Sequence, residues 1–266
     1  MVFETLKLEI KNAIAKITLT VTPNRKFPTL DVQTGKELLT ATEQCETDQR
    51  VRVLIITGTG KAFCAGGDIK KFKEAIESGK SGEMMETLTK DLYQIAYKLR
   101  TLRIPVIAAV NGYAIGAGMN LVLSCDFIIA VEEAQFAESF INLGLIPGFA
   151  GTYMLPKLLP WPKVAELCFF GENISAAELE RLGLVNKVVP GGELEKVVND
   201  YAERLAKQPT LAIGRMKKLF MEGLNKDLKN GIENERKMQV LSAKSEDYKE
   251  GVFAFNEKRK PVFKGQ

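Results

Sequence analysis

The sequence predicts an α/β protein with a helical C-terminal region, and three observations carry this prediction. Short apolar or alternating runs typical of strands are interspersed with segments whose apolar residues recur at helical spacing. Two of the strands run into turns built from small residues. From Gln208 onwards the pattern is helical, with no long linker and no internal repeat. We therefore expect a core over residues 1–207 and a helical region over residues 208–266.

The N-terminal part is expected to form a hairpin followed by a helix. Alternating apolar and polar residues in Thr5–Ile10 and Ile14–Thr20 predict two strands, with the turn at Lys11-Asn12. Asp31 has the character of an N-cap, because an aspartate there can accept a hydrogen bond from the first turn of a helix. That helix is expected to continue to about Cys45.

The next strand leads into the first small-residue turn. Val51–Thr57 has the apolar pattern of a buried strand, and the turn at Phe63–Ile69 reads FCAGGDI. Lys70–Glu86 has no strong period, which is compatible with a mobile cover over a site. A helix follows, and its apolar stripe consists of Leu88, Leu92, Ile95, Leu99 and Leu102.

The second small-residue turn lies within Ile104–Ala130. Pro105–Val110 is a buried-strand pattern, and Gly116-Ala117-Gly118 removes side-chain bulk from the turn before the next helix. A ligand could therefore approach N–H groups that the first helical turn leaves unpaired, where the helix dipole adds positive potential. Close packing of a helix against a strand would select the same small residues.

The remaining elements before Gln208 have clear start and stop signals. A loop rich in Gly and Pro spans Gly144–Thr152, and Trp161 is interpreted as a core residue. Ser175-Ala-Ala-Glu178 has the spacing of a capping box, which predicts a short helix. A strand is expected at Leu184–Val189, followed by an amphipathic helix at 194–205.

The composition restricts the chemistry of any active site. The chain has no histidine, which excludes Ser-His and Cys-His relays together with the commonest metal ligand. The four cysteines form no CxxC pair, so we expect reduced thiols in or near the core and no metal site; they are Cys45, Cys64, Cys125 and Cys168. Proton transfer would use Asp, Glu, Tyr, Lys, Cys or water.

Charge and hydropathy exclude further classes of protein. A net charge of +4, from 37 basic and 33 acidic residues, is too small to indicate a nucleic-acid partner. No apolar run reaches the roughly 18 to 20 residues of a membrane span. Glu4, Lys7 and Glu9 stand where a signal peptide would be apolar. We expect a cytoplasmic protein that binds neither nucleic acid nor membrane.

Five motifs in order, AFCAGGDIK, NGYAIGAGMN, CDFIIA, GLIPGFAGT and AFNEKRKPVFKG, resemble the crotonase, or enoyl-CoA hydratase/isomerase, superfamily. The resemblance covers nearly the whole chain. It implies a spiral core of ββα superhelical turns with a C-terminal helical trimerisation region, and usually a trimer or a dimer of trimers. It also implies a substrate carried as a coenzyme A thioester, with no permanently bound cofactor.

The same resemblance implies roles for individual residues. The thioester carbonyl oxygen would lie between two backbone N–H groups, those of Gly67 and Ala117, which would stabilise an enolate. Residues that would contact coenzyme A are Lys26, Ala65, Asp68, Ile69, Phe255 and Lys258. The last two match C-terminal family residues that often act from a neighbouring subunit.

The chain departs from the family pattern where typical hydratases have two glutamates. Those positions are Asn120 and Phe140, neither of which can act as a general base. Gly148 replaces the aspartate that some isomerising members have after the loop proline. The remaining acid/base candidates are Glu138, Asp68, Tyr113 and Tyr153, and Asp68 also has the position of a helix cap.

Glu138 precedes the expected glutamate position by two residues. In an extended segment Glu138 and Phe140 share a face, whereas in a helix Glu138 would point elsewhere. Asn120 could hold a water or a substrate oxygen, and Phe140 favours an apolar or cyclic acyl group. We therefore expect a CoA-thioester lyase or isomerase with relocated acid/base groups. A decarboxylase-like reaction and a catalytically weak acyl-CoA-binding paralogue remain as alternatives.

Overall fold

The computed structural model describes residues 2–23 and 25–266 and contains, within that range, two mixed β-sheets and a set of C-terminal helices. The first sheet has six strands in the order β1-β2-β3-β5-β7-β10, and the second has four in the order β4-β6-β8-β9. The strands are β1 (Leu6–Lys11), β2 (Ile14–Leu19), β3 (Val53–Gly58), β4 (Ala62–Cys64), β5 (Val106–Val110), β6 (Tyr113–Ile115), β7 (Phe127–Val131), β8 (Gln135–Ala137), β9 (Ile174–Ser175) and β10 (Lys187–Val189).

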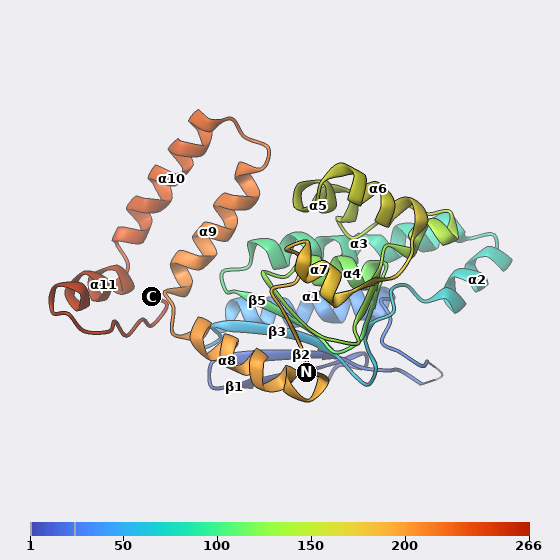
Figure 1. Cartoon of the computed structure of the whole chain (residues 1–266), viewed down its shortest axis with the longest axis horizontal. Helices are drawn as coiled ribbons and strands as arrows, with labels where there is room; N and C mark the ends of the chain where they lie inside the picture. Colours follow the sequence, from blue (N-terminus) through green and yellow to red (C-terminus); the bar gives the residue numbers. More distant parts are fainter. Residues whose placement is uncertain (1, 24) are drawn as a thin grey trace.

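The helices lie on both faces of the first sheet and extend beyond it. Helix α8 packs against β2, β3, β5 and β7, whereas α1 packs against β1 and α3 (Figure 1). The helices are α1 (Val32–Thr47), α2 (Ile69–Glu77), α3 (Ser81–Thr101), α4 (Ala117–Leu123), α5 (Gly151–Leu158), α6 (Trp161–Phe170), α7 (Ala176–Arg181), α8 (Leu194–Ala206), α9 (Thr210–Gly223), α10 (Leu228–Ala243) and α11 (Glu246–Asn256), with short 3-10 helices η1 (Ser139–Leu143) and η2 (Gly191–Glu193).

Most N-terminal predictions are confirmed. The hairpin pairs β1 with β2 in antiparallel register, although its turn is at Asn12-Ala13, whose φ angles are 50° and 66°. Asp31 caps α1 by accepting a 2.8 Å hydrogen bond from the Thr34 N–H. Ser175 caps α7 in the same way through Glu178 N–H.

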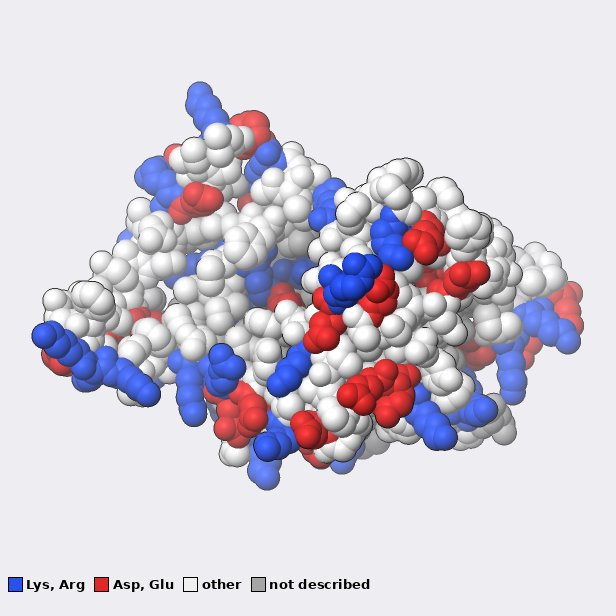
Figure 2. All heavy atoms as spheres, viewed as in Figure 1, with Lys and Arg blue, Asp and Glu red and all other residues white. Residues whose placement is uncertain are grey.

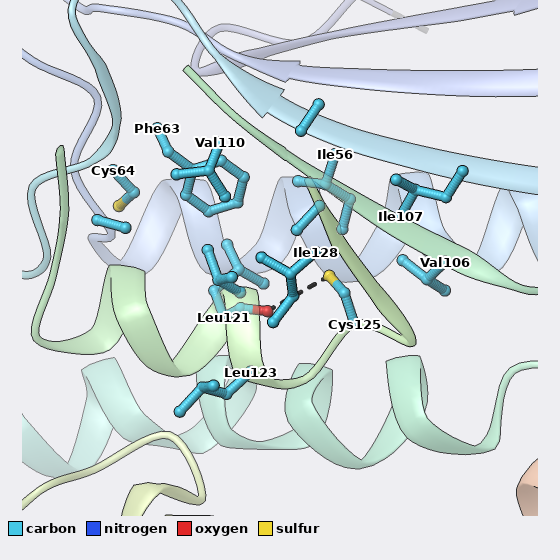
Figure 3. Packing of buried hydrophobic residues seen from close by; sticks show 14 of the residues in the cluster. Ile56, Phe63, Cys64, Val106, Ile107, Val110, Leu121, Leu123, Cys125 and Ile128 are labelled. Atoms are coloured by element: carbon cyan, nitrogen blue, oxygen red, sulfur yellow. Dashed lines mark hydrogen bonds between the residues drawn. The ribbon is translucent and has the colours of Figure 1, made fainter. Parts of the chain in front are cut away.

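Helix α4 is fixed by burial on all sides, which matters because its N-terminus carries Ala117. Figure 3 shows Leu121 and Cys125 beside Ile128 of β7, below strands β3 and β5. A Cβ added to Gly118 would lie 2.3 Å from the Cys64 carbonyl oxygen, so this residue serves the close packing of helix against strand. The cysteine residues are free thiols; Cys45, Cys64 and Cys125 are buried, and Cys168 is half-buried.

Three sequence predictions need correction. The prediction that Trp161 is a core residue is wrong. Trp161 is the first residue of α6, and 65% of its surface is exposed. The segment Lys70–Glu86 does have a helical period, since it forms most of α2 and the start of α3, and its role as a mobile cover stays a prediction. The helical pattern expected from Gln208 to the end of the chain stops at Asn256, and residues 257–266 form a non-helical tail.

The C-terminal helices α9, α10 and α11 project from the body as a separate lobe (Figure 1). On the face shown in Figure 2, basic and acidic side chains are interspersed. Within the described residues, no helix has the combination of length and apolar character that crossing a bilayer requires.

Candidate active site

The two small-residue turns meet at one apolar cavity of about 290 Å³. Its walls come from the turn after β4, the N-terminus of α4, helices α2 and α3, the 3-10 helix η1 and the loop before α5. Its larger apolar side chains include Leu30, Phe72, Leu88, Leu92, Phe140 and Phe149. The lining of the cavity is therefore mostly apolar.

Gly67 and Ala117 both line this cavity, one from each turn. Glycines at positive φ precede them, with Gly66 at +84° and Gly116 at +55°, a conformation that other residues rarely adopt. The Leu30 N–H donates to the Gly66 carbonyl at 2.7 Å and fixes the first turn. Within residues 2–23 and 25–266, neither the Gly67 N–H nor the Ala117 N–H has a hydrogen-bond acceptor. Two residues whose N–H groups have no acceptor among the described residues thus line one apolar space.

Asn120 and Glu138 lie behind the cavity wall instead of lining it. The Asn120 amide donates to the Gly148 carbonyl at 2.9 Å and to Glu138 Oε2 at 3.3 Å. Glu138 is fully buried at the N-terminus of η1. Because the chain turns into η1 directly after Glu138, Glu138 and Phe140 do not share a face. Phe140 lines the cavity, and Glu138 points away from it.

Burial raises the pKa of Glu138 to about 8, and the hydrogen bond from Asn120 only partly offsets that effect. Glu138 is therefore mostly a neutral carboxylic acid at pH 7. Among the described residues, neither Oε1 of Glu138 nor Oδ1 of Asn120 has a hydrogen-bond partner. A neutral acid tolerates such a position better than a carboxylate, because the charged form loses far more hydration.

The residues proposed to contact coenzyme A divide into three groups. Ala65 and Ile69 line the cavity, and Lys26 is exposed, with its ammonium 5.4 Å from the centre of the Phe27 ring. Asp68 caps α2 and is directed toward Arg25, so its carboxylate is engaged inside the protein. Phe255 and Lys258 lie in the C-terminal lobe, at the opposite end of the molecule from α2 (Figure 1).

Comparison with known proteins identifies the family. The enoyl-CoA hydratase/isomerase family model matches residues 9–266. The chain is 33% identical to a probable enoyl-CoA hydratase of Rhodobacter capsulatus, with 100% of each chain covered. It is also 33% identical to 1,2-epoxyphenylacetyl-CoA isomerase of Escherichia coli, covering 97% of this chain and 98% of that protein. The chain belongs to the enoyl-CoA hydratase/isomerase, or crotonase, family.

The fold agrees with this assignment. A solved enoyl-CoA hydratase subunit from Geobacillus kaustophilus superimposes with a TM-score of 0.89 at 37% identity, and 99% of each chain is covered. The expected crotonase fold is therefore confirmed. The enzyme class follows as a hydratase/isomerase-type lyase or isomerase acting on CoA thioesters.

In this crotonase, the cavity is also lined by Tyr93, a polar residue that was not among the candidates from the sequence. Tyr93 of α3 reaches the cavity beside Phe149, whereas the two tyrosines considered from the sequence, Tyr113 and Tyr153, do not line it. Tyr153 instead accepts a hydrogen bond from Asn225 and lies under Lys157. The only signal in the sequence was an aromatic residue beside the apolar stripe of the helix.

An ion network that joins distant segments supports the Gly67 turn. Arg25 donates to Thr29 Oγ1 at 2.8 Å, to Asp31 at 2.8 Å and to Asp68 at 2.7 Å. Burial acts to raise the pKa of Asp31, but hydrogen bonds from Arg25, Lys71 and Thr34 outweigh it and hold that pKa well below its usual range. Since Asp68 directly follows Gly67, the network fixes the backbone that carries the first N–H donor.

Arg25→Gln should lower the free energy of unfolding by about 2–4 kcal/mol, because the nearly buried Asp68 carboxylate loses its cation while only Asp31 keeps one, from Lys71. Urea unfolding of the variant measures this loss. Arg50→Gln is the matched control, since Arg50 pairs with Asp48 on the surface and should change stability by no more than about 0.5 kcal/mol. Equal, small losses in both variants would contradict the network's role.

The neutral state of Glu138 predicts a pH-dependent stability. Between about 4.5, the pKa of an ordinary glutamate, and about 8, the folded state binds a proton that the unfolded state has lost. The contribution of Glu138 is therefore fully present below about pH 4.5 and disappears as the pH rises through 8. Glu138→Gln stays neutral throughout, so its stability relative to wild type should rise by a few kcal/mol between pH 5 and pH 8. Thermal unfolding curves with the same pH dependence for both proteins would count against a raised pKa.

Proposed function

We propose that this crotonase binds an acyl-CoA thioester with its carbonyl oxygen between the N–H groups of Gly67 and Ala117, and that these groups stabilise an enolate. The observation that carries the proposal is that two N–H donors without protein acceptors face one apolar cavity. In such a water-poor space, hydrogen bonds to a developing oxyanion are worth more than in water. Coenzyme A itself would extend past Ala65 and Ile69 towards Lys26.

The reaction that fits best is a decarboxylase-like step, which chiefly needs enolate stabilisation, or an isomerisation whose proton transfers use relocated acid/base groups. Of the described residues that line the cavity, none carries a carboxylate. Asn120 and Phe140 occupy the positions of the two hydratase glutamates, so fast water addition has no base in the usual places. The names of the relatives do not select a reaction, because a probable hydratase and an isomerase are equally similar to the chain.

A catalytically weak acyl-CoA-binding protein is the second candidate, and the same carboxylate-free wall favours it. Assays with 2-enoyl-, 3-enoyl- and malonyl-type CoA esters separate the two. Turnover of the 3-enoyl or malonyl-type ester supports an enzyme. Tight binding of all three esters without turnover supports the second candidate.

Calorimetry tests the binding part of the proposal. An acyl-CoA and free coenzyme A should bind in the micromolar range, and Lys258→Ala should weaken both, because Lys258 is proposed to contact the nucleotide. Lys11→Ala, on the exposed hairpin, is the matched control and should leave binding unchanged. If none of the CoA esters binds, the proposed function is overturned.

We propose further that residues 208–266 assemble the chain into a trimer or a dimer of trimers. Helices α9, α10 and α11 enclose a groove of about 1250 Å³, and apolar side chains remain exposed there, among them Phe220 at 69% and Phe255 at 83%. Such a surface is unusual for a monomer. Assembly would also give Phe255 and Lys258 a route to the cavity of a neighbouring copy, since they lie far from the cavity of their own chain (Figure 1).

Light scattering should therefore report a mass of three or six times 29.5 kDa at micromolar concentration. Phe220→Glu should shift this mass towards the monomer, because a buried, unpaired charge at an interface is costly. Ile76→Glu is the control, because Ile76 is 68% exposed on α2, at the opposite end of the molecule from α11 (Figure 1). A monomeric wild type would contradict the proposal.

A further inference from the structure

The polar side chains that line the cavity are few, and three of them carry hydroxyl groups: Thr89, Tyr93 and Ser139. The Thr89 hydroxyl donates its hydrogen bond within its own helix, to the Met85 carbonyl at 2.9 Å. Ser139 lies beside Gly116, at the N–H donors. Among the described residues that line the cavity, Tyr93 alone has a titratable side chain.

The position of the Tyr93 hydroxyl is fixed by the turn before α5. It accepts a hydrogen bond from the Phe149 N–H, and its ring meets the Phe149 ring edge-on at 6.5 Å. A Cβ added to Gly148 would lie 2.0 Å from this hydroxyl oxygen, so the glycine is what leaves room for it. The hydroxyl therefore lies next to Gly148, in the space that a Cβ at this position would fill.

The hydroxyl has a proton left to donate. Burial raises the pKa of Tyr93 above its ordinary value of 10, so the phenol remains protonated at neutral pH. Its oxygen already accepts from Phe149, and no side chain or carbonyl of the described residues accepts a hydrogen bond from it. A bound ligand can supply the missing acceptor.

This donor acts at a different point from the two N–H groups. The Asn120 amide holds the Gly148 carbonyl at 2.9 Å, and Asn120 is three residues beyond Ala117 on α4. Three residues correspond to about 4.5 Å of helix rise. A hydroxyl beside Gly148 therefore meets the acyl chain, and the N–H groups meet the thioester oxygen.

We propose that Tyr93 is a specificity-determining residue whose hydroxyl donates a hydrogen bond to an oxygen on the acyl chain. The preferred substrate is then an otherwise apolar acyl-CoA that carries one acceptor oxygen, such as a ketone, ether or hydroxyl. This inference rests on the proposed function, because it assumes that the acyl chain enters the cavity.

Tyr93 also has a structural role that an experiment must separate from recognition. Phe149 and Ala150 have φ angles of 53° and 63°, and the Tyr93 oxygen helps to hold this strained turn. The Tyr93 hydroxyl supports the turn through a lone pair of its oxygen, which accepts the hydrogen bond from Phe149. Recognition of an acyl-chain oxygen would instead use the hydroxyl proton. Loss of the support for the turn would weaken the binding of every ester equally. Loss of the hydrogen bond to the ligand would weaken only the binding of esters whose acyl chain carries an oxygen.

The test compares hexanoyl-CoA with its 3-oxo, 4-oxo and 5-oxo derivatives by calorimetry. In each pair a ketone replaces a methylene at one position, so chain length is constant. We expect at least one ketone to bind about 3- to 10-fold more tightly than hexanoyl-CoA, the gain of one neutral hydrogen bond. Tyr93→Phe should abolish this preference and retain hexanoyl-CoA binding.

Tyr97→Phe is the matched control, because Tyr97 lies one turn further along α3, is 66% exposed and does not line the cavity. It should keep the wild-type preference. If Tyr93→Phe does not fold, Gly148→Ala provides a second route, since its Cβ must displace the hydroxyl. Equal binding of all four esters to wild type, or a preference that survives in Tyr93→Phe, overturns the inference. In those cases bound hexanoyl-CoA leaves the proposed function intact, and only a failure to bind any ester would remove both.

Discussion

Hydration of crotonyl-CoA by this protein should be at least about 100-fold slower than by a crotonase with both glutamates. Positioned acid and base groups each contribute roughly 100- to 10,000-fold, and we propose that Asn120 and Phe140 stand at the two glutamate positions here. The structure adds that Asn120 lies behind the wall with its amide bound to the Gly148 carbonyl, so it cannot hold water in the cavity. The decrease in enoyl-thioester absorbance measures the rate.

Returning carboxylates should restore part of this rate. The double change Asn120→Glu with Phe140→Glu should raise hydration, and Phe140→Glu carries most of the effect because only position 140 lines the cavity. The apolar wall will raise the pKa of the new Glu, so the gain should grow with pH. Fast hydration by wild type would contradict the prediction, and Glu138→Gln would then show whether the buried Glu138 has become the base.

Ala117→Pro should lower kcat/KM for any ester that the protein turns over by about 100- to 1,000-fold, the usual loss for one oxyanion donor. Proline has no N–H, and Ala117 is the first residue of α4, where a helix tolerates proline. The fold should therefore survive, which circular dichroism can verify. Binding of free coenzyme A, which lacks the thioester oxygen, should change little.

Ala117→Gly is the matched variant, since it keeps the N–H and removes only a methyl group. Its rate should remain within a few-fold of wild type. A folded Ala117→Pro protein with an undiminished rate would show that this N–H does not meet the thioester oxygen. Similar losses in both variants would indicate that the methyl group matters more than the donor.

Local chemistry explains why much of the fold could be predicted. The hairpin of β1 and β2, the caps at Asp31 and Ser175 and the short α7 depend on residues within a few positions of one another. Even there, the turn was displaced by one residue, to Asn12-Ala13. Predictions that depended on which side of an element faces the core were less secure. Trp161 has a core-type side chain, yet the position of α6 leaves it mostly exposed.

The sequence by itself determined the family and the two glycine turns, because each of these is a matter of residue identity in a short motif. The direction of Glu138 was decided by tertiary structure, since a 3-10 turn at Ser139 places it behind Phe140.

The partners of Arg25 and Tyr93 were likewise beyond the sequence. Arg25 meets Asp68 from 43 residues away, and Tyr93 meets Phe149 from a different element altogether. Such contacts follow from how helices and loops pack around the cavity, and no local pattern encodes them. The motifs specify the two glycine turns, whereas the packing decides which side chains line the cavity.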